Sequence, residues 1–317
     1  MAAGHESGEQ VAGRTVVVTG AFSYTGKYTT RLLLEHGCNL RTLTNHRGRE
    51  NPFGDRVEVF PYNFNQPERL EESLQGADTL INTYWVRFPH RGVTYDTAVH
   101  NTLALITAAR QAGIRRMVHV SIANPSLDSP LGYYRGKARL EEAVRQSGMT
   151  YAIVRPTVIF GREDILINNI AWFVRRFPVL GIPGDGRYGI QPIYVEDMAA
   201  MLADAAMRED SFTRDAAGPE TYTFEELVRL IASSLRRRAG TLHLPAPLAY
   251  LATRLVGAWV RDVVLTWDEY RGLMSNLLVS REPPAGTSSL RKGLEENCEH
   301  IGARYVSELS RHFRSAS

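Results

Sequence analysis

The stretch TVVVTGAFSYTG, residues 15–26, joins a β-branched run to a turn that contains two glycines. A short run of valine and threonine that ends at a glycine is typical of a strand buried on both faces. Residues 26–36 have the composition of a helix, with leucines at 32–34 that can pack on a sheet. We therefore expect a strand, a sharp turn and a helix in direct succession.

The two glycines of this turn, Gly20 and Gly26, favour binding of an anion at the start of the helix. Gly20 can adopt backbone angles that other residues resist, and Gly26 allows the helix to pack closely on the sheet. The helix N-terminus then directs free N–H groups at an anion such as a pyrophosphate. Ser23 stands where a middle glycine is usual, and its side chain could hydrogen-bond the phosphates or crowd them. The context favours dinucleotide binding, and a purely structural turn is the alternative.

Strands and helices alternate through the first half of the chain. This alternation implies parallel strands with right-handed crossovers, in an α/β fold built on a Rossmann-type doubly wound sheet. Ligands of such sheets bind at the carboxyl ends of the strands, so functional residues should follow them. The expected strands are 15–19, 39–44, 57–62, 78–83, 115–121 and 150–155, and the expected helices are 26–36, 67–74, 93–112 and 133–147.

The pattern becomes irregular after Arg155. We expect a dinucleotide-binding domain over residues 14–160, to which a strand and helix at 191–207 return. Residues 161–190 and 208–317 are expected to form a smaller, mostly helical, substrate-binding region. The polar residues 1–13 are predicted to be a disordered tail.

The segment after the second strand bears on which dinucleotide binds. An acidic residue at this place usually holds the ribose 2′-hydroxyl of NAD, but residues 44–49 contain none. Arg47 or Arg49 could instead pair with a 2′-phosphate. The sequence therefore favours NADP(H), with NAD(H) as the second choice. The alternative is that both arginines are solvated loop residues.

Tyr133 and Lys137 lie four residues apart in a predicted helix and so share one face. A neighbouring ammonium lowers the pKa of a phenol, which otherwise titrates near pH 10. Such a pair can exchange a proton with a carbonyl or an alcohol while a hydride moves at carbon. Ser121, at the end of the fifth strand, could bind the same oxygen, and Ser126 or Ser129 could replace it. Taken alone, a tyrosine and lysine at this spacing usually belong to a solvated helix face.

Together these motifs resemble the short-chain dehydrogenase/reductase superfamily, in its extended and atypical branch. The resemblance also rests on Asn82-Thr83, Asn101, RPTVIFG at 155–161 and QPIYVEDMA at 191–199. It implies that Tyr133 is the general acid/base, that Lys137 lowers its pKa and holds the nicotinamide ribose, and that Ser121 positions the substrate. The cofactor-binding residues implied are Gly20, Phe22, Ser23, Tyr24, Thr25, Gly26, Asn45, Arg47, Asn63, Thr83, Tyr84, Lys137 and Pro156.

Within the superfamily, three segments are similar to NAD(P)-binding proteins related to the NADPH-holding accessory subunit of mitochondrial complex I. They are GAFSYTGKY at 20–28, YYRGKA at 133–138 and RPTVIFGREDILINNIAWFVRRFP at 155–178. That relative implies cofactor binding without turnover. Two hypotheses therefore stand: an NADP(H)-dependent oxidoreductase, or a related epimerase or dehydratase, and a non-catalytic NADPH-binding sensor or assembly protein.

Composition limits the remaining choices. The 37 basic and 34 acidic residues give a net charge of +3, too small for a dense nucleic-acid-binding face. Two cysteines form neither a disulfide framework nor a metal signature, which suggests a reducing compartment, and we expect the cytosol. No secretory signal or transmembrane segment is apparent. The expected partner is a small-molecule substrate and not a nucleic acid, and both a monomer and a homodimer stay open.

Two further segments allow more than one interpretation. Residues 85–91, after the fourth strand, could form a wall of the substrate pocket or a flexible surface loop. Leu248, Leu251, Leu255 and Trp259 have helical spacing, which fits packing in a core or a dimer better than contact with a membrane surface.

Overall fold

The structure is a computed structural model that describes residues 13–45 and 50–312. The chain divides into two compact units. The first consists of the chain up to Arg155 with Met198–Arg214, and the second of Pro156–Asp197 with the chain from Asp215 onward. The first boundary and the returning segment thus lie within seven residues of the expected ones. The predicted tail, apart from Gly13, lies outside the described residues.

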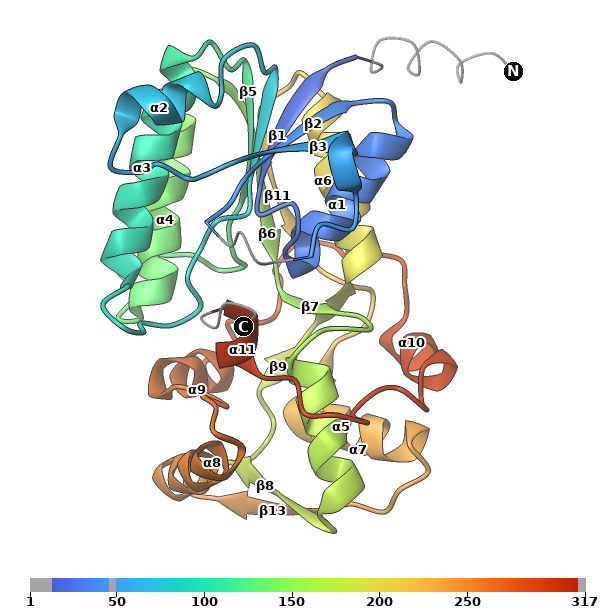
Figure 1. Cartoon of the computed structure of the whole chain (residues 1–317). Helices are drawn as coiled ribbons and strands as arrows, with labels where there is room; N and C mark the ends of the chain where they lie inside the picture. Colours follow the sequence, from blue (N-terminus) through green and yellow to red (C-terminus); the bar gives the residue numbers. More distant parts are fainter. Residues whose placement is uncertain (1–12, 46–49, 313–317) are drawn as a thin grey trace. The chain divides into compact units, whose positions relative to one another are not determined.

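A seven-stranded sheet with the strand order β11-β6-β5-β4-β1-β2-β3 forms the centre of the first unit. β1 pairs in parallel with both β2 and β4, so the strand order reverses direction there. In Figure 1, α2, α3 and α4 cover one face of the sheet, and α1 and α6 lie on the other. The predicted doubly wound α/β fold is confirmed. The strands are β1 (Thr15–Thr19), β2 (Asn39–Leu43), β3 (Val57–Phe60), β4 (Thr79–Asn82), β5 (Arg116–Val120), β6 (Thr150–Pro156) and β11 (Phe212–Ala216).

The helices of this unit begin and end where the sequence supplies suitable residues. They are α1 (Tyr24–Glu35), α2 (Pro67–Glu72), α3 (Tyr95–Gln111), α4 (Gly132–Arg145) and α6 (Val195–Met207), with a short 3-10 turn at Gly54–Arg56. Thr94 caps α3, and Thr97 completes a capping box with it. The valines of β1, residues 16–18, are fully buried, as expected for a strand covered on both faces.

The second unit contains short paired strands and helices. β7 pairs with β10, and β8 with β13, in parallel, whereas β9 and β12 are antiparallel. A capping box of Thr223 and Glu226 starts α7. The strands are β7 (Val158–Phe160), β8 (Val179–Pro183), β9 (Gly189–Ile190), β10 (Pro192–Tyr194), β12 (Tyr222–Thr223) and β13 (Gly240–Leu244). The helices are α5 (Leu166–Arg176), α7 (Phe224–Ser234), α8 (Ala246–Val260), α9 (Trp267–Met274), α10 (Leu290–Glu296) and α11 (Glu308–His312).

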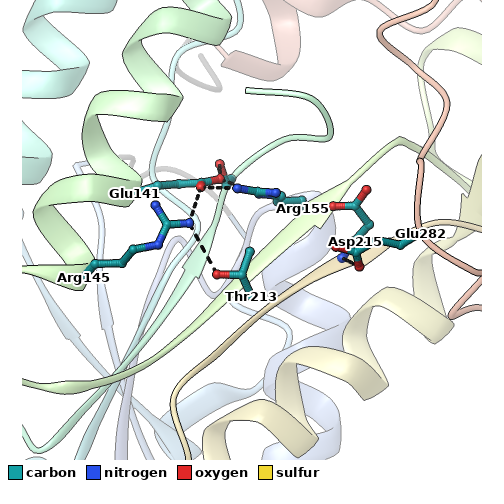
Figure 2. Close-up of polar contacts among 7 residues, drawn as sticks. Glu141, Arg145, Arg155, Thr213, Asp215 and Glu282 are labelled. Carbon is teal, nitrogen blue, oxygen red and sulfur yellow. Dashed lines mark hydrogen bonds and ion pairs between the residues drawn. The ribbon is translucent and has the colours of Figure 1, made fainter. Parts of the chain in front are cut away.

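A buried carboxylate ties α4 to β6 in the first unit. Glu141 is 1% exposed and accepts two hydrogen bonds from Arg155, at 2.8 and 2.6 Å, and one from Arg145 at 2.8 Å. Figure 2 shows it between the two guanidiniums, with Arg145 also reaching Thr213. Desolvation raises the pKa of Glu141, but the bonds from Arg155 and Ser121, with the charge of Arg155, lower it below its ordinary value.

We expect Glu141→Gln to lower the free energy of unfolding at pH 7 by about 2 kcal/mol, less than for a fully buried pair because both guanidiniums are partly exposed. The folded-state pKa of Glu141 is depressed, so its stabilisation is present above the ordinary pKa of 4.5 and is lost as the pH falls through the folded value. Urea denaturation at several pH values measures both effects. Glu142→Gln, an exposed neighbour on α4, is the control. Equal losses in the two variants would contradict the assigned role.

Candidate cofactor and active site

A tight turn joins β1 to α1. Gly20 has a φ of 69°, and its carbonyl accepts a hydrogen bond of 2.8 Å from the Ser23 N–H. A Cβ atom on Gly26 would lie 2.1 Å from that same carbonyl oxygen. Both positions therefore require glycine: Gly20 for its backbone angles, and Gly26 because the first turn of α1 touches the preceding loop. The close neighbour of Gly26 is thus the turn itself and not, as we expected, the sheet.

Ser23 caps α1. Its hydroxyl oxygen accepts from the Gly26 N–H at 3.3 Å, so the residue in the place of the middle glycine satisfies a helix N–H. No acidic residue lies in the first turn, which leaves this helix end favourable for an anion. Phe22, Tyr24 and Thr25 lie half-buried in the same turn. The turn that contains Gly20 and Gly26, together with the N-terminus of α1, fits the pyrophosphate of a dinucleotide.

The ends of β2 and β3 carry two more predicted cofactor residues. Asn45 follows β2, is exposed, and accepts from the Tyr62 N–H at 3.0 Å. Asn63 follows β3 with a φ of 47°, and its carbonyl accepts from the Gln66 N–H. Both lie at the carboxyl edge of the sheet, as predicted. Arg47 and Arg49 lie outside the described residues.

A hydroxyl that we did not single out joins the ends of β1 and β4. Thr19 Oγ1 donates to Asn82 Oδ1 at 3.1 Å and accepts from the backbone N–H groups of Thr83 and Tyr84 at 2.7 and 3.1 Å. The Thr83 hydroxyl donates to the Thr19 carbonyl. Tyr84 accepts from Asn101 Nδ2 at 2.8 Å. These bonds hold Thr83 and Tyr84, two of the predicted cofactor-binding residues, in place at the end of β4.

A buried histidine behind this edge was also missed. His119 in β5 is fully buried, and its Nδ1 lies 3.1 Å from Asn82 Nδ2. Burial, with a smaller effect of the Lys137 charge, lowers the pKa of His119 well below its ordinary value, so the ring is neutral. A histidine between two valines of the strand RMVHV was the only signal.

Lys137 is enclosed where α4 packs on β5. Its side chain is 2% exposed, and Nζ donates to the Val120 carbonyl at 2.7 Å. The same amine lies 4.5 Å from the centre of the Trp85 ring. Burial lowers its pKa from 10.5 to about 7, although the charge of Glu141 acts in the opposite direction. The lysine predicted to activate Tyr133 is therefore only about half protonated near pH 7.

The Trp85 ring rests on a helix surface that lacks side chains. A Cβ atom on Gly136 would lie 2.9 Å from Trp85, and one on Gly132 would lie 2.9 Å from the ring of Tyr95. The indole stacks on Tyr95, with centroids 6.1 Å apart, and meets Tyr133 edge to face at 5.5 Å. Two glycines one turn apart thus form a slot for two rings beside Tyr133. Trp85 therefore packs against α4, and its predicted place in the wall of a substrate pocket stays a prediction.

Ser121 lies close by, but its hydroxyl is engaged. It is 3% exposed and donates to Glu141 Oε1 at 2.6 Å. The oxygens of Ser126 and Ser129 accept from backbone N–H groups two residues on, at 3.2 Å each. The substrate-positioning role of Ser121 stays a prediction, and its observed bond does not favour it. Pro156 is buried at the end of β6.

Comparison with known proteins relates this arrangement to a family. A family model described as NAD(P)H-binding matches residues 20–165. "NADH dehydrogenase [ubiquinone] 1 alpha subcomplex subunit 9, mitochondrial" of Arabidopsis thaliana is 31% identical over 295 residues, 85% of this chain and 72% of that protein. "Ceramide reductase" of Caulobacter vibrioides is 28% identical over 256 residues, 77% of this chain and 78% of that protein.

The fold has close counterparts among solved structures. UDP-glucose 4-epimerase of Thermotoga maritima aligns with a TM-score of 0.68 at 16% identity, over 90% of this chain and 98% of that one. At this identity the likeness concerns the fold alone, and it is the fold of the extended short-chain dehydrogenase/reductases.

The comparisons also correct one expectation. The matching NADH dehydrogenase subunits are mitochondrial proteins, which overturns the cytosolic location that we expected. A low cysteine count indicates a reducing environment but does not distinguish one reducing compartment from another. With 31% identity to the Arabidopsis protein over most of both chains, the chain belongs to the family of NAD(P)H-binding proteins that includes subunit 9 of the mitochondrial NADH dehydrogenase alpha subcomplex.

Proposed function

We propose that this chain holds NADP(H) without turning it over, as an accessory component of a mitochondrial NADH dehydrogenase. Its family membership supports the setting, and the turn of Gly20 and Gly26 with the N-terminus of α1 supports the dinucleotide. A bound nicotinamide can supply or accept a hydride. The residues around the predicted acid/base favour retention of the cofactor over that reaction.

This proposal rests on the burial of the Lys137 amine beneath the Trp85 ring. A lysine assists a tyrosine by standing charged beside the phenol, which lowers the phenol's pKa. Here burial brings the pKa of the amine to about 7, its hydrogen bond goes to Val120, and the Trp85 ring lies over it. Ser121 is bonded to Glu141. Two of the three predicted catalytic groups thus have other partners.

The preference for NADP(H) over NAD(H) is part of the proposal. Thr44 and Asn45 at the end of β2 carry no charge, so neither repels a 2′-phosphate. An aspartate there would accept a hydrogen bond from the 2′-hydroxyl of NAD and oppose the phosphate of NADP.

A second candidate function is hydride transfer with Tyr133 as the acid/base. Tyr133 and Lys137 keep the spacing of the superfamily, and a relative of similar length is named a reductase. In this case Trp85 would leave the amine when substrate binds. The substrate would be a small molecule with a carbonyl or alcohol group, and the epimerase or dehydratase variant uses the same pair.

We expect Asn45→Asp to weaken NADPH binding relative to NADH by about tenfold, equivalent to about 1.4 kcal/mol. The new carboxylate keeps the acceptor for the Tyr62 N–H, so the turn should remain intact. Fluorescence titration of both nucleotides measures the ratio. Asn39→Asp places the same charge at the other end of β2 and should leave the ratio unchanged. An unaltered ratio in Asn45→Asp would show that the end of β2 does not contact the ribose.

A test for NADPH oxidation distinguishes cofactor retention from hydride transfer. We expect the wild-type chain to bind NADPH and to leave it unoxidised with a panel of aldehydes, ketones and lipid carbonyls. Trp85→Ala should keep the nucleotide affinity, because the predicted pyrophosphate site lies at α1. Oxidation of NADPH by the wild type, reduced about 10²–10⁴-fold in Tyr133→Phe at unchanged affinity, would contradict the proposal and establish Tyr133 as the acid/base.

A further inference from the structure

Helix α8 carries an apolar face that the described residues of the second unit leave exposed. Leu248, Leu251, Leu255 and Trp259 follow one another at intervals of three, four and four residues, so they form one stripe. Their side chains are 54–66% exposed. Of the two kinds of packing that we expected, packing in a core is therefore wrong, and packing in a dimer stays a prediction. The opposite side of the helix is the packed one, with Ala249 and Gly257 buried and Thr253 bonded to Tyr270.

The stripe continues onto neighbouring elements. The Trp259 ring lies 6.5 Å from that of Phe177, which precedes β8 and is 38% exposed. Val179 in β8 is level with Gly240 in β13, so Val179 and Leu242 point to the same side of the strand pair. Both are about half exposed, at 51% and 54%. We call these seven residues the α8 apolar surface: Phe177, Val179, Leu242, Leu248, Leu251, Leu255 and Trp259.

The charges that accompany this surface have one sign. From residue 227 to residue 261 the sequence contains no aspartate or glutamate. Arg236–Arg238 lead into β13, beside Val179, while Arg254 and Arg261 belong to α8 and its end. All five of these arginines are exposed, and none forms an ion pair with another residue that the structure describes.

From this combination we propose that the α8 apolar surface lies on an anionic lipid bilayer. A helix with an exposed apolar stripe, a tryptophan and only basic charges has the character of helices that bind membrane interfaces. Acidic headgroups complement the arginines, and the leucines and Trp259 enter the boundary of the acyl chains. Among the described helices, none is both long and apolar enough to cross a bilayer, so α8 would lie in the interface plane.

A second copy of the chain fits this surface less well. In a symmetric dimer the same patch meets itself, so the arginines beside the patch of one copy would lie near those of the other. Like charges brought together in this way oppose association. On an anionic lipid surface this repulsion is absent, and the same arginines attract the acidic headgroups.

Flotation of the full chain with lipid vesicles tests the proposal. We expect binding to vesicles of phosphatidylcholine with phosphatidylglycerol, little binding to phosphatidylcholine alone, and weaker binding as salt is raised. The triple variant Leu251→Gln, Leu255→Gln and Trp259→Gln should weaken binding by about tenfold or more. Replacing Arg236, Arg237 and Arg238 by glutamine should weaken it about fivefold for each arginine.

Matched controls keep the result interpretable. Leu103→Gln with Leu127→Gln changes exposed leucines of the first unit, and binding should not change. Thermal melting checks that each variant is folded, as expected for changes at exposed positions. Failure of the wild type to bind anionic vesicles, or equal binding by the triple variant, would overturn the proposal. Light scattering that shows a dimer, which the triple variant converts to a monomer, without vesicle binding would assign the surface to a second copy.

Discussion

The amine of Lys137 lies between a backbone carbonyl and an indole ring, with almost no access to solvent. This enclosure depends on Gly136, because any side chain there would collide with Trp85. Desolvation then removes much of the positive charge that the amine would carry in water. The proposal of cofactor retention rests on this one enclosure, because an amine with a pKa of about 7 is only about half protonated near neutrality.

The surrounding fold makes such an enclosure possible. The parallel sheet brings the ends of β1, β4 and β5 to one edge, where Thr19, Asn82 and His119 form a polar layer with little water. Glu141 and its arginines hold α4 against β5 and β6, and the glycines of α4 then face the loop that carries Trp85. Ring packing thus encloses the Lys137 amine, while the glycine turn between β1 and α1 is retained.

Local patterns in the sequence predicted the first unit well. Alternating apolar runs gave its strands and helices, and the spacing of Gly20, Ser23 and Gly26 indicated the turn, because each depends on residues close together in the chain. The contacts that decide the site are of another kind. Trp85 and Lys137 are 52 residues apart, and Ser121 and Glu141 are 20 apart, so no local period reveals either pair.

The second unit shows the same limit. Its strands are two to five residues long, too short to give a recognisable alternation. The stripe on α8 has the period of a core helix, and only its surroundings show that it faces outward. Gly132 and Gly136 were the one signal for the aromatic cover, since glycines one turn apart in a helix leave room for close neighbours.

Titration of the Lys137 amine by NMR tests the central claim most directly, with its resonance assigned through Lys137→Arg and with Trp85→Ala measured alongside. An enclosed amine predicts a pKa of about 7 in the wild type and a rise toward 10.5 once the indole is removed. A wild-type amine that titrates at its ordinary value would show that Trp85 does not enclose Lys137, and would contradict the proposal of cofactor retention.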